Sequence, residues 1–339
     1  MSRRRMLSIF ITALTIFGLV HQAAAKERQG TVTIQASLNA SAEAKNVKLW
    51  IPYPMSNKNQ DITSVSISGN YADTGIYKEP KDGASVLYAE WNAPAKDRVL
   101  TYTFTIKRKE VVTRNFPKKE LPLSTEELRQ YLDNSHLGSS EKRVKEIASE
   151  ITRGKKTILE KSRAVYDWVV DNMRRDPNVK GCGLQEIDRL LTEKGGKCAD
   201  ISSVYIALSR ASGIPARHVY GIRMPKITDG DITKFQHCWA EFYLPGYGWV
   251  VVDPADVLKF KLEKNPTPEE LRAKREYFFG AVDESRIALN SAEHIMLNPP
   301  QNGRPLLYFM YPYAEVDGKP LNEDLYGFNI GYKIIYKEQ

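Results

Sequence analysis

Apolar and polar residues alternate along much of the first third of the chain. Period-two patterns cover Val32 to Leu38, Val47 to Ile51, and Leu100 to Ile106. Alternation of this kind predicts antiparallel strands with one buried face. We therefore expect residues 26–112 to form an all-β, sandwich-like accessory domain.

The spacing becomes helical farther along. A connector over 113–139 contains two prolines, which break regular structure. Apolar side chains then recur at helical spacing in three segments, at 144–151, 158–169 and 198–212. Two strands follow at 238–244 and 249–253, joined by a Pro-Gly-Tyr-Gly turn that favours a β-hairpin. The pattern predicts an α+β core over 140–256 and a C-terminal extension, 257–339, that packs on this core.

The first 25 residues have the three parts of a secretory signal. Arg3 to Arg5 are basic, Met6 to Val20 form an apolar run, and Ala23 to Ala25 are small. The apolar run is short for a membrane-spanning helix. We therefore expect residues 1–25 to be a cleaved signal peptide. The mature protein is then periplasmic or secreted, with no stable membrane insertion.

The net charge of the chain excludes few classes of partner. The chain carries 49 basic and 41 acidic residues, a formal charge of +8, and three of the basic residues lie in the signal sequence. A mildly basic mature chain is compatible with an anionic cell-surface polymer. No basic run with interleaved aromatic residues is present, so we expect no nucleic-acid partner.

Cysteine chemistry is the first functional candidate. The chain has only Cys182, Cys198 and Cys238, and an odd number in an exported protein leaves either one disulfide and a free thiol, or three free thiols. Cys198 begins a predicted helix directly after a glycine-rich loop. The N-terminus of a helix lowers the pKa of a thiol and offers N–H groups to an oxyanion. Cys198 is therefore a candidate nucleophile.

A thiol nucleophile needs a base, and the predicted hairpin offers one. His237 starts its first strand and Asp253 ends its second. Their mean position falls in the turn, so we expect the two residues to face each other within about one residue of register. A carboxylate there orients one ring nitrogen and leaves the other for the thiol. Cys198, His237 and Asp253 are thus the candidate catalytic triad.

A metal site at Cys198, His237 and Cys238 was the alternative use of these side chains. Adjacent residues of a strand point to opposite faces, so His237 and Cys238 do not readily share an ion. We therefore expect no metal and no cofactor.

The segments around the triad resemble the bacterial transglutaminase-like superfamily. They are Gly195 to Asp200, Ala211 to Arg217, and His237 through Pro254. The sequence Leu49-Trp50-Ile51-Pro52 also looks like the β-rich region often found beside such a domain. The resemblance implies a papain-like α+β core and assigns nucleophile, base and orienting acid to Cys198, His237 and Asp253. It does not fix the reaction, because relatives include cross-linkers, peptidases, amidases and inactive scaffolds.

The expected function is thiol-dependent acyl transfer at amide bonds through a thioester. Free access of water favours a peptidase or amidase over a cross-linking transglutaminase, with a protein or a peptide-containing envelope polymer as substrate. The competing hypothesis is a catalytically silent cell-envelope binding module. Two details stay open: Gln185 or Trp168 as a second oxyanion donor, and a disulfide between Cys182 and Cys238.

Overall fold

The computed structural model describes residues 26–339, except 118, 125, 127, 135–140, 227, 322–324 and 328. The predicted signal peptide, residues 1–25, lies outside the described residues. In the part of the chain that is described, no helix combines the length and the apolar character needed to cross a membrane.

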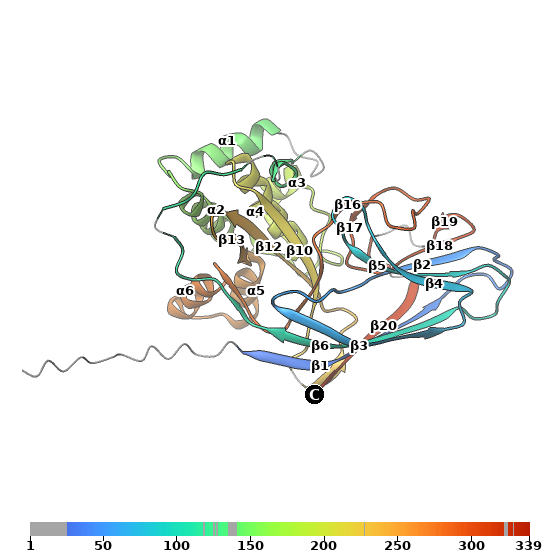
Figure 1. Ribbon diagram of the computed structural model, residues 1–339. Coiled ribbons are helices and arrows are strands. Elements are labelled where there is room, and N and C mark those ends of the chain that lie inside the picture. Colours follow the sequence, from blue (N-terminus) through green and yellow to red (C-terminus); the bar gives the residue numbers. More distant parts are fainter. Residues whose placement is uncertain are drawn as a thin grey trace, which may run out of the picture.

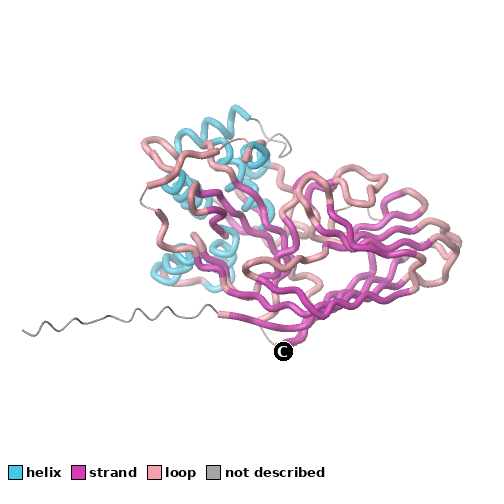
Figure 2. Tube along the Cα trace, viewed as in Figure 1, coloured by secondary structure: helices cyan, strands magenta, loops and turns pink. Residues whose placement is uncertain are grey.

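One half of the molecule is a sandwich of two antiparallel sheets (Figures 1 and 2). The first sheet has the strand order β11 (Asp229–Asp231), β20 (Ile330–Glu338), β1 (Glu27–Leu38), β6 (Val99–Lys109) and β3 (Gln60–Gly69). The second has the order β19 (Lys319–Pro320), β18 (Tyr313–Val316), β2 (Val47–Pro52), β5 (Ser85–Trp91) and β4 (Asp73–Lys78).

The alternating pattern explains why these strands pack face to face. The apolar residues of β1, at positions 32, 34, 36 and 38, are all buried, and so are those of β6 at positions 100, 102, 104 and 106. They belong to one apolar cluster with residues of β2 and β5 from the opposite sheet. The predicted sandwich-like domain is confirmed.

The other half is an α+β core. Its four-stranded sheet has the order β13 (Gly248–Val252), β12 (Gln236–Leu244), β10 (Ala216–Arg223) and β15 (Arg286–Asn290). Its helices are α1 (Glu141–Ile151), α2 (Ile158–Asn172), α3 (Ile187–Glu193), α4 (Cys198–Ala211), α5 (Pro254–Lys264) and α6 (Pro268–Tyr277), with a 3₁₀ turn η1 (Arg129–Leu132) before them. Helix α4 packs on β12 and is buried on all sides, as its largely apolar sequence requires. The predicted α+β fold class is confirmed.

Three short strand pairs complete the fold. They are β8 (Arg174–Arg175) with β9 (Gly195–Gly196), β7 (Val111–Val112) with β14 (Ala281–Val282), and β16 (Glu293–Ile295) with β17 (Leu306–Tyr308). The parallel pair of β8 and β9 fixes the glycine loop that leads into α4.

The structure divides the C-terminal residues, 257–339, between both halves. Strand β15 extends the core sheet, whereas β18 pairs with β2 and β20 pairs with β1 along its length, from Gly30 opposite Glu338 to Leu38 opposite Ile330. The segment therefore does more than pack on the core. The boundaries expected at 112 and 257 mark changes in the type of element, while the sandwich is closed by strands from the end of the chain.

Candidate active site

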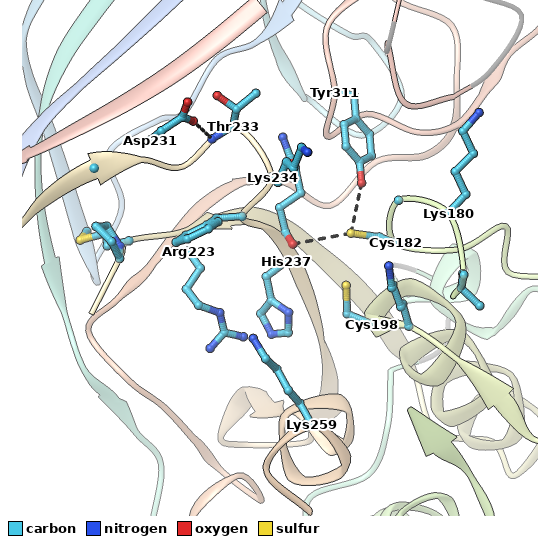
Figure 3. Close-up of a pocket in the computed structure, with 18 of the residues that line it drawn as sticks. Lys180, Cys182, Cys198, Arg223, Asp231, Thr233, Lys234, His237, Lys259 and Tyr311 are labelled. Carbon is cyan, nitrogen blue, oxygen red and sulfur yellow. Dashed lines mark hydrogen bonds between the residues drawn. The ribbon is translucent and has the colours of Figure 1, made fainter. Parts of the chain in front are cut away.

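A cavity of about 840 Å³ opens beside the first turn of α4. Cys198 and His237 both line it, together with Cys182 and Tyr311 (Figure 3). Two of the three predicted triad residues thus reach one cavity. Asp253 is fully buried behind them.

The loop before Cys198 has little freedom. The backbone N–H groups of Lys197 and Gln185 donate to the carboxylate of buried Asp200, at 3.2 and 3.0 Å. A Cβ atom on Gly196 would lie 2.4 Å from the Cβ of Asp200, so only glycine fits there. These contacts hold the thiol at the first residue of α4, where N–H groups lack partners within the helix.

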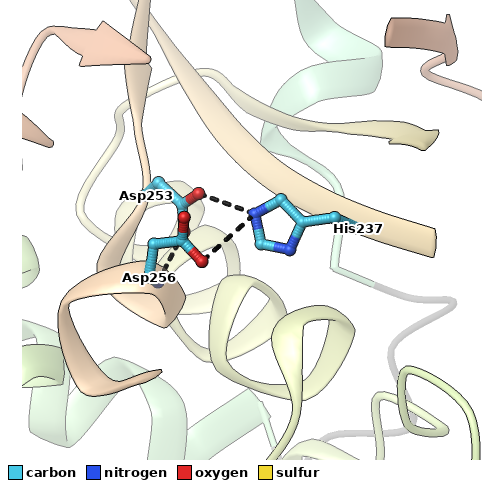
Figure 4. Close-up of side chains that lie close together, drawn as sticks. All are labelled: His237, Asp253 and Asp256. Atoms are coloured by element: carbon cyan, nitrogen blue, oxygen red, sulfur yellow. Dashed lines mark hydrogen bonds and ion pairs between the residues drawn. The ribbon is translucent and has the colours of Figure 1, made fainter. Parts of the chain in front are cut away.

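His237 is the second residue of β12 and turns its ring toward Asp253. Its Nε2 lies 2.8 Å from Asp253 Oδ2 and 3.8 Å from Asp256 Oδ1 (Figure 4). The hairpin register pairs Ala240 with Val252, so Asp253 comes opposite Trp239 rather than opposite His237. The expected facing pair is therefore wrong by two residues. Both side chains still share a face, because a shift of two preserves the direction of a strand side chain.

Asp253 is held from three sides. As the N-cap of α5 it accepts from the backbone N–H of Asp256 through Oδ1, at 2.9 Å. Its Oδ2 accepts from Arg286 and from His237. Since a carboxylate only accepts, the proton of this contact sits on His237 Nε2, and Nδ1 is left for the thiol.

Two arginines balance the carboxylates behind His237. Arg223 binds both oxygens of Asp256, at 2.7 and 2.8 Å, and Arg286 bridges Asp253 and Asp256. The positive charges of Arg223 and Arg286 hold the pKa of Asp256 well below its usual range, although burial acts against them. Burial and Arg223 lower the pKa of His237, but the carboxylates of Asp253 and Asp256 outweigh them and raise it. The site therefore favours an imidazolium.

The three thiols are free and buried, so the structure contains no disulfide between Cys182 and Cys238. Hydrogen bonds from Cys182, Cys238 and His237 hold the pKa of Cys198 well below its ordinary value, against the effect of burial. The hydrogen bond to Cys198, together with burial, raises the pKa of Cys182. Burial and the same partner raise that of Cys238. Negative charge therefore concentrates on Cys198.

The two suggested oxyanion donors are engaged elsewhere. The Gln185 side chain donates to the Tyr220 hydroxyl at 3.1 Å within the protein interior. The Trp168 ring lies on α2 beneath the ammonium of Lys194, 5.8 Å away. Neither residue lines the cavity. The backbone N–H of Cys198 is the donor that the geometry offers.

His237, Asp253 and Asp256 are close enough to hold a metal ion, since one potential ligand atom of each lies within 4.8 Å of the others. The guanidinium groups of Arg223 and Arg286 already bind these carboxylates. A cation would have to displace them, so the donor set fits an ion pair network better than a metal centre.

Sequence reasoning missed Asp256, Arg223 and Arg286. Asp256 had a signal, because Asp253-Pro254-Ala255-Asp256 places an N-cap and a first-turn acid at the start of a helix. Arg286 had none, since it reaches the site from β15, 33 residues beyond Asp253.

Comparison with known proteins shows the family of the chain. Residues 145–254, which include all three triad positions, match the family model of the transglutaminase-like superfamily. The chain is 35% identical over 302 residues to an uncharacterized protein of Haemophilus influenzae, covering 81% of this chain and 82% of that relative. A 126-residue stretch is 29% identical to the uncharacterized protein YebA of Bacillus subtilis, covering 33% of this chain and 17% of YebA.

A solved structure shares the fold. The crystal structure of a candidate cysteine protease from Cytophaga hutchinsonii aligns with a TM-score of 0.56 at 15% identity, covering 92% of this chain and 98% of that one. The similarity extends over the sandwich as well as the core. The family match and the Haemophilus influenzae relative lead to one conclusion: the chain belongs to the transglutaminase-like superfamily.

Proposed function

We propose that this protein is a thiol-dependent peptidase or amidase that uses Cys198 as nucleophile, His237 as general acid and base, and Asp253 as the orienting acid. The observation that carries the proposal is the position of His237. Its ring hydrogen bonds to Asp253, it acts to lower the pKa of Cys198, and it lines the same open cavity as that thiol.

The proposed reaction begins with the Cys198 thiolate. It attacks the carbonyl carbon of an amide, and the resulting oxyanion is stabilised by the Cys198 N–H at the start of α4. The C–N bond then breaks while the His237 imidazolium gives its proton to the leaving amine. His237 then takes a proton from water as the water oxygen attacks the thioester carbon. The C–S bond breaks and the carboxylic acid leaves, which restores the Cys198 thiolate and the His237 imidazolium.

The acceptor distinguishes hydrolysis from cross-linking. A cavity of about 840 Å³ leaves room for water beside a bound acyl group, which supports hydrolysis. A lysine amine arriving by the same route would form an isopeptide bond instead. For an exported protein, the peptides of the cell envelope are the substrates we propose, and periplasmic or secreted localisation belongs to the same proposal.

Cys198→Ala tests the function. Purified wild type and variant are incubated with envelope peptides and proteins, and new N-termini and new isopeptide bonds are identified by mass spectrometry. We expect new N-termini with the wild type and a loss of more than about a thousandfold with the variant. The unfolding free energy should change by about 1 kcal/mol or less, because only one sulfur atom is removed.

Isopeptide bonds without new N-termini would reassign the protein as a transglutaminase. The binding-module alternative gains support if wild-type Cys198 also fails to react with any thiol-directed electrophile in reducing buffer.

A further inference from the structure

The cavity beside Cys198 is lined by more positive than negative groups. Apart from Arg223, which binds Asp256, the basic lining residues include Arg175, Lys197, Lys226, Lys234 and Lys259. Asp231 and Glu263 are the only acidic ones among the lining residues. Asp231 already lies 3.9 Å from Lys333, outside the cavity lining. The cavity therefore has an excess of positive charge.

Lys259 is a partly buried cation among these lining residues. Its side chain extends from α5 into the cavity, toward the guanidinium of Arg223 (Figure 3). Among the described residues, the carboxylate within 4 Å of its ammonium is that of Glu263, whose Oε1 lies one helical turn away at 3.8 Å. Burial, followed by the charges of Arg223 and Arg175, lowers the pKa of Lys259. A half-buried ammonium beside two guanidinium groups is stabilised when an anion binds between them.

Arg175 lines the same cavity from another element, β8. Its backbone pairs with Gly196, two residues before Cys198. Its positive charge acts to lower the pKa of both Cys182 and Lys259, which line the same cavity. Among the described residues, no carboxylate forms an ion pair with the Arg175 side chain, although it lines the cavity. Two cations from different elements, β8 and α5, thus line the cavity that Cys198 also lines.

We propose that this cavity selects acyl donors that carry a carboxylate next to the reacting amide, as in peptides rich in glutamate or aspartate, and that Lys259 and Arg175 bind this carboxylate. The inference rests on the proposed function and adds the substrate class to it. Arginine can hold a carboxylate through two parallel hydrogen bonds, and lysine adds a point charge. The same charges disfavour lysine or arginine at that substrate position.

Two small alkylating agents test the charge preference without a known substrate. Iodoacetate carries a carboxylate where the neutral iodoacetamide carries an amide. The rate ratio of the two reagents at Cys198 is measured by peptide mapping and compared with the ratio for free cysteine. We expect the ratio at Cys198 to be about tenfold higher at low salt and to fall as salt screens the charges. A ratio equal to that of free cysteine would overturn the inference.

Variants locate the effect. Lys259→Gln and Arg175→Gln should each lower the ratio by about three- to tenfold, because each removes one attracting charge. Lys261→Gln is the matched control, since Lys261 is exposed on the same helix and does not line the cavity. Taking the ratio divides out any change in the thiol itself. An equal effect of all three variants would mean a general surface potential and would contradict a specific site.

Peptide electrophiles then test the substrate class. Matched probes differ only in Glu or Gln beside the reactive group, and the wild type should capture the Glu probe about tenfold faster. Lys259→Glu should reverse the preference toward a Lys probe.

Protection of Cys198 by phosphatidylglycerol vesicles but not by acidic peptides would overturn the choice of a peptide. If no reagent labels Cys198 at all, the proposed function itself fails.

Discussion

Two buried histidine–carboxylate pairs lie on neighbouring strands of the core sheet. His237 on β12 contacts Asp253, and His218 on β10 contacts Glu293 through Nδ1, at 2.5 Å. Each pair meets a candidate nucleophile on the same helix, α4: Cys198 for His237, and Ser203, whose Oγ lies 3.1 Å from His218 Nε2. By hydrogen bonding alone, both clusters resemble triads.

The two clusters differ in whether they reach the cavity and in whether the proton of the candidate nucleophile is already used in a hydrogen bond. Ser203 and His218 are fully buried and do not line the cavity, and the Ser203 hydroxyl also donates to the Ala199 carbonyl at 2.7 Å. Its proton is thus used within the helix. Cys198 sits one and a half turns earlier, where the helix begins and the cavity opens. The difference teaches that a cluster with no access to a cavity serves the core, whereas the helix end and the cavity make chemistry possible.

Both clusters are balanced by an arginine. Arg286 binds Asp253, and Arg210 binds Glu293 at 3.1 Å. A buried carboxylate with a guanidinium partner is costly to break from either side. The two pairs therefore predict different effects of matched carboxylate-to-amide substitutions.

The largest effect is expected for Asp253→Asn. The amide keeps the shape but neither holds the ring in the right tautomer nor stabilises the imidazolium, so the acyl-transfer rate should fall by about 10⁴-fold. Stability should also fall, because Arg286 loses one of its carboxylates. Steady-state kinetics and the rate of covalent probe capture measure the first effect, and urea unfolding measures the second. A rate within tenfold of wild type would remove Asp253 from the mechanism.

Glu293→Gln should reduce stability strongly and change the reactivity of Cys198 little. It leaves buried Arg210 and His218 without the charge of their common partner, at a cost of about 3–5 kcal/mol in unfolding free energy. At a temperature where the variant is folded, probe capture by Cys198 should stay within about threefold of wild type, as expected for a cluster that touches no substrate. A folded Glu293→Gln protein that has lost capture would show that the two clusters act together.

The candidate catalytic residues were easier to find from the sequence than the residues that hold them in place. The three segments with helical or hairpin patterns identified Cys198, His237 and Asp253, because local spacing determines a helix start and a two-stranded turn. The register of the hairpin was missed by two residues, since the mean position cannot say which residues close the turn. His237 and Asp253 still point to the same face of the sheet, because a register error of two residues does not reverse the direction of a side chain.

Contacts distant in sequence were beyond prediction. The pairing of β20 with β1 joins residues about 300 positions apart, and alternation in both segments fits many partners equally well. Arg286 enters the site the same way, from a strand whose pattern carries no sign of catalysis. The all-β character of the N-terminal domain was predictable from period two alone, but the strands that complete it were not.

The smallest predicted effect is the change in the alkylation rate of Cys198 with pH. Only thiolate reacts with iodoacetamide, so a free cysteine loses about tenfold in rate for each pH unit below its pKa. The pKa of Cys198 is held well below the ordinary value of 9.0, so its thiolate should persist as the pH falls, and its rate should change by less than about threefold between pH 8 and pH 6. The pKa values of Cys182 and Cys238 are raised, so both should react more slowly than free cysteine throughout.

Peptide mapping after brief alkylation of the folded protein measures all three rates at once. Cys238 is the internal control, because it lies next to His237 in sequence, is fully buried and does not line the cavity. Acyl transfer itself should fall above the raised pKa of His237, since the leaving amine then lacks its proton donor. If the alkylation rate of Cys198 changes tenfold per pH unit and never exceeds that of Cys182, Cys198 is not an activated nucleophile. It is then, like Ser203, a buried group held by its neighbours.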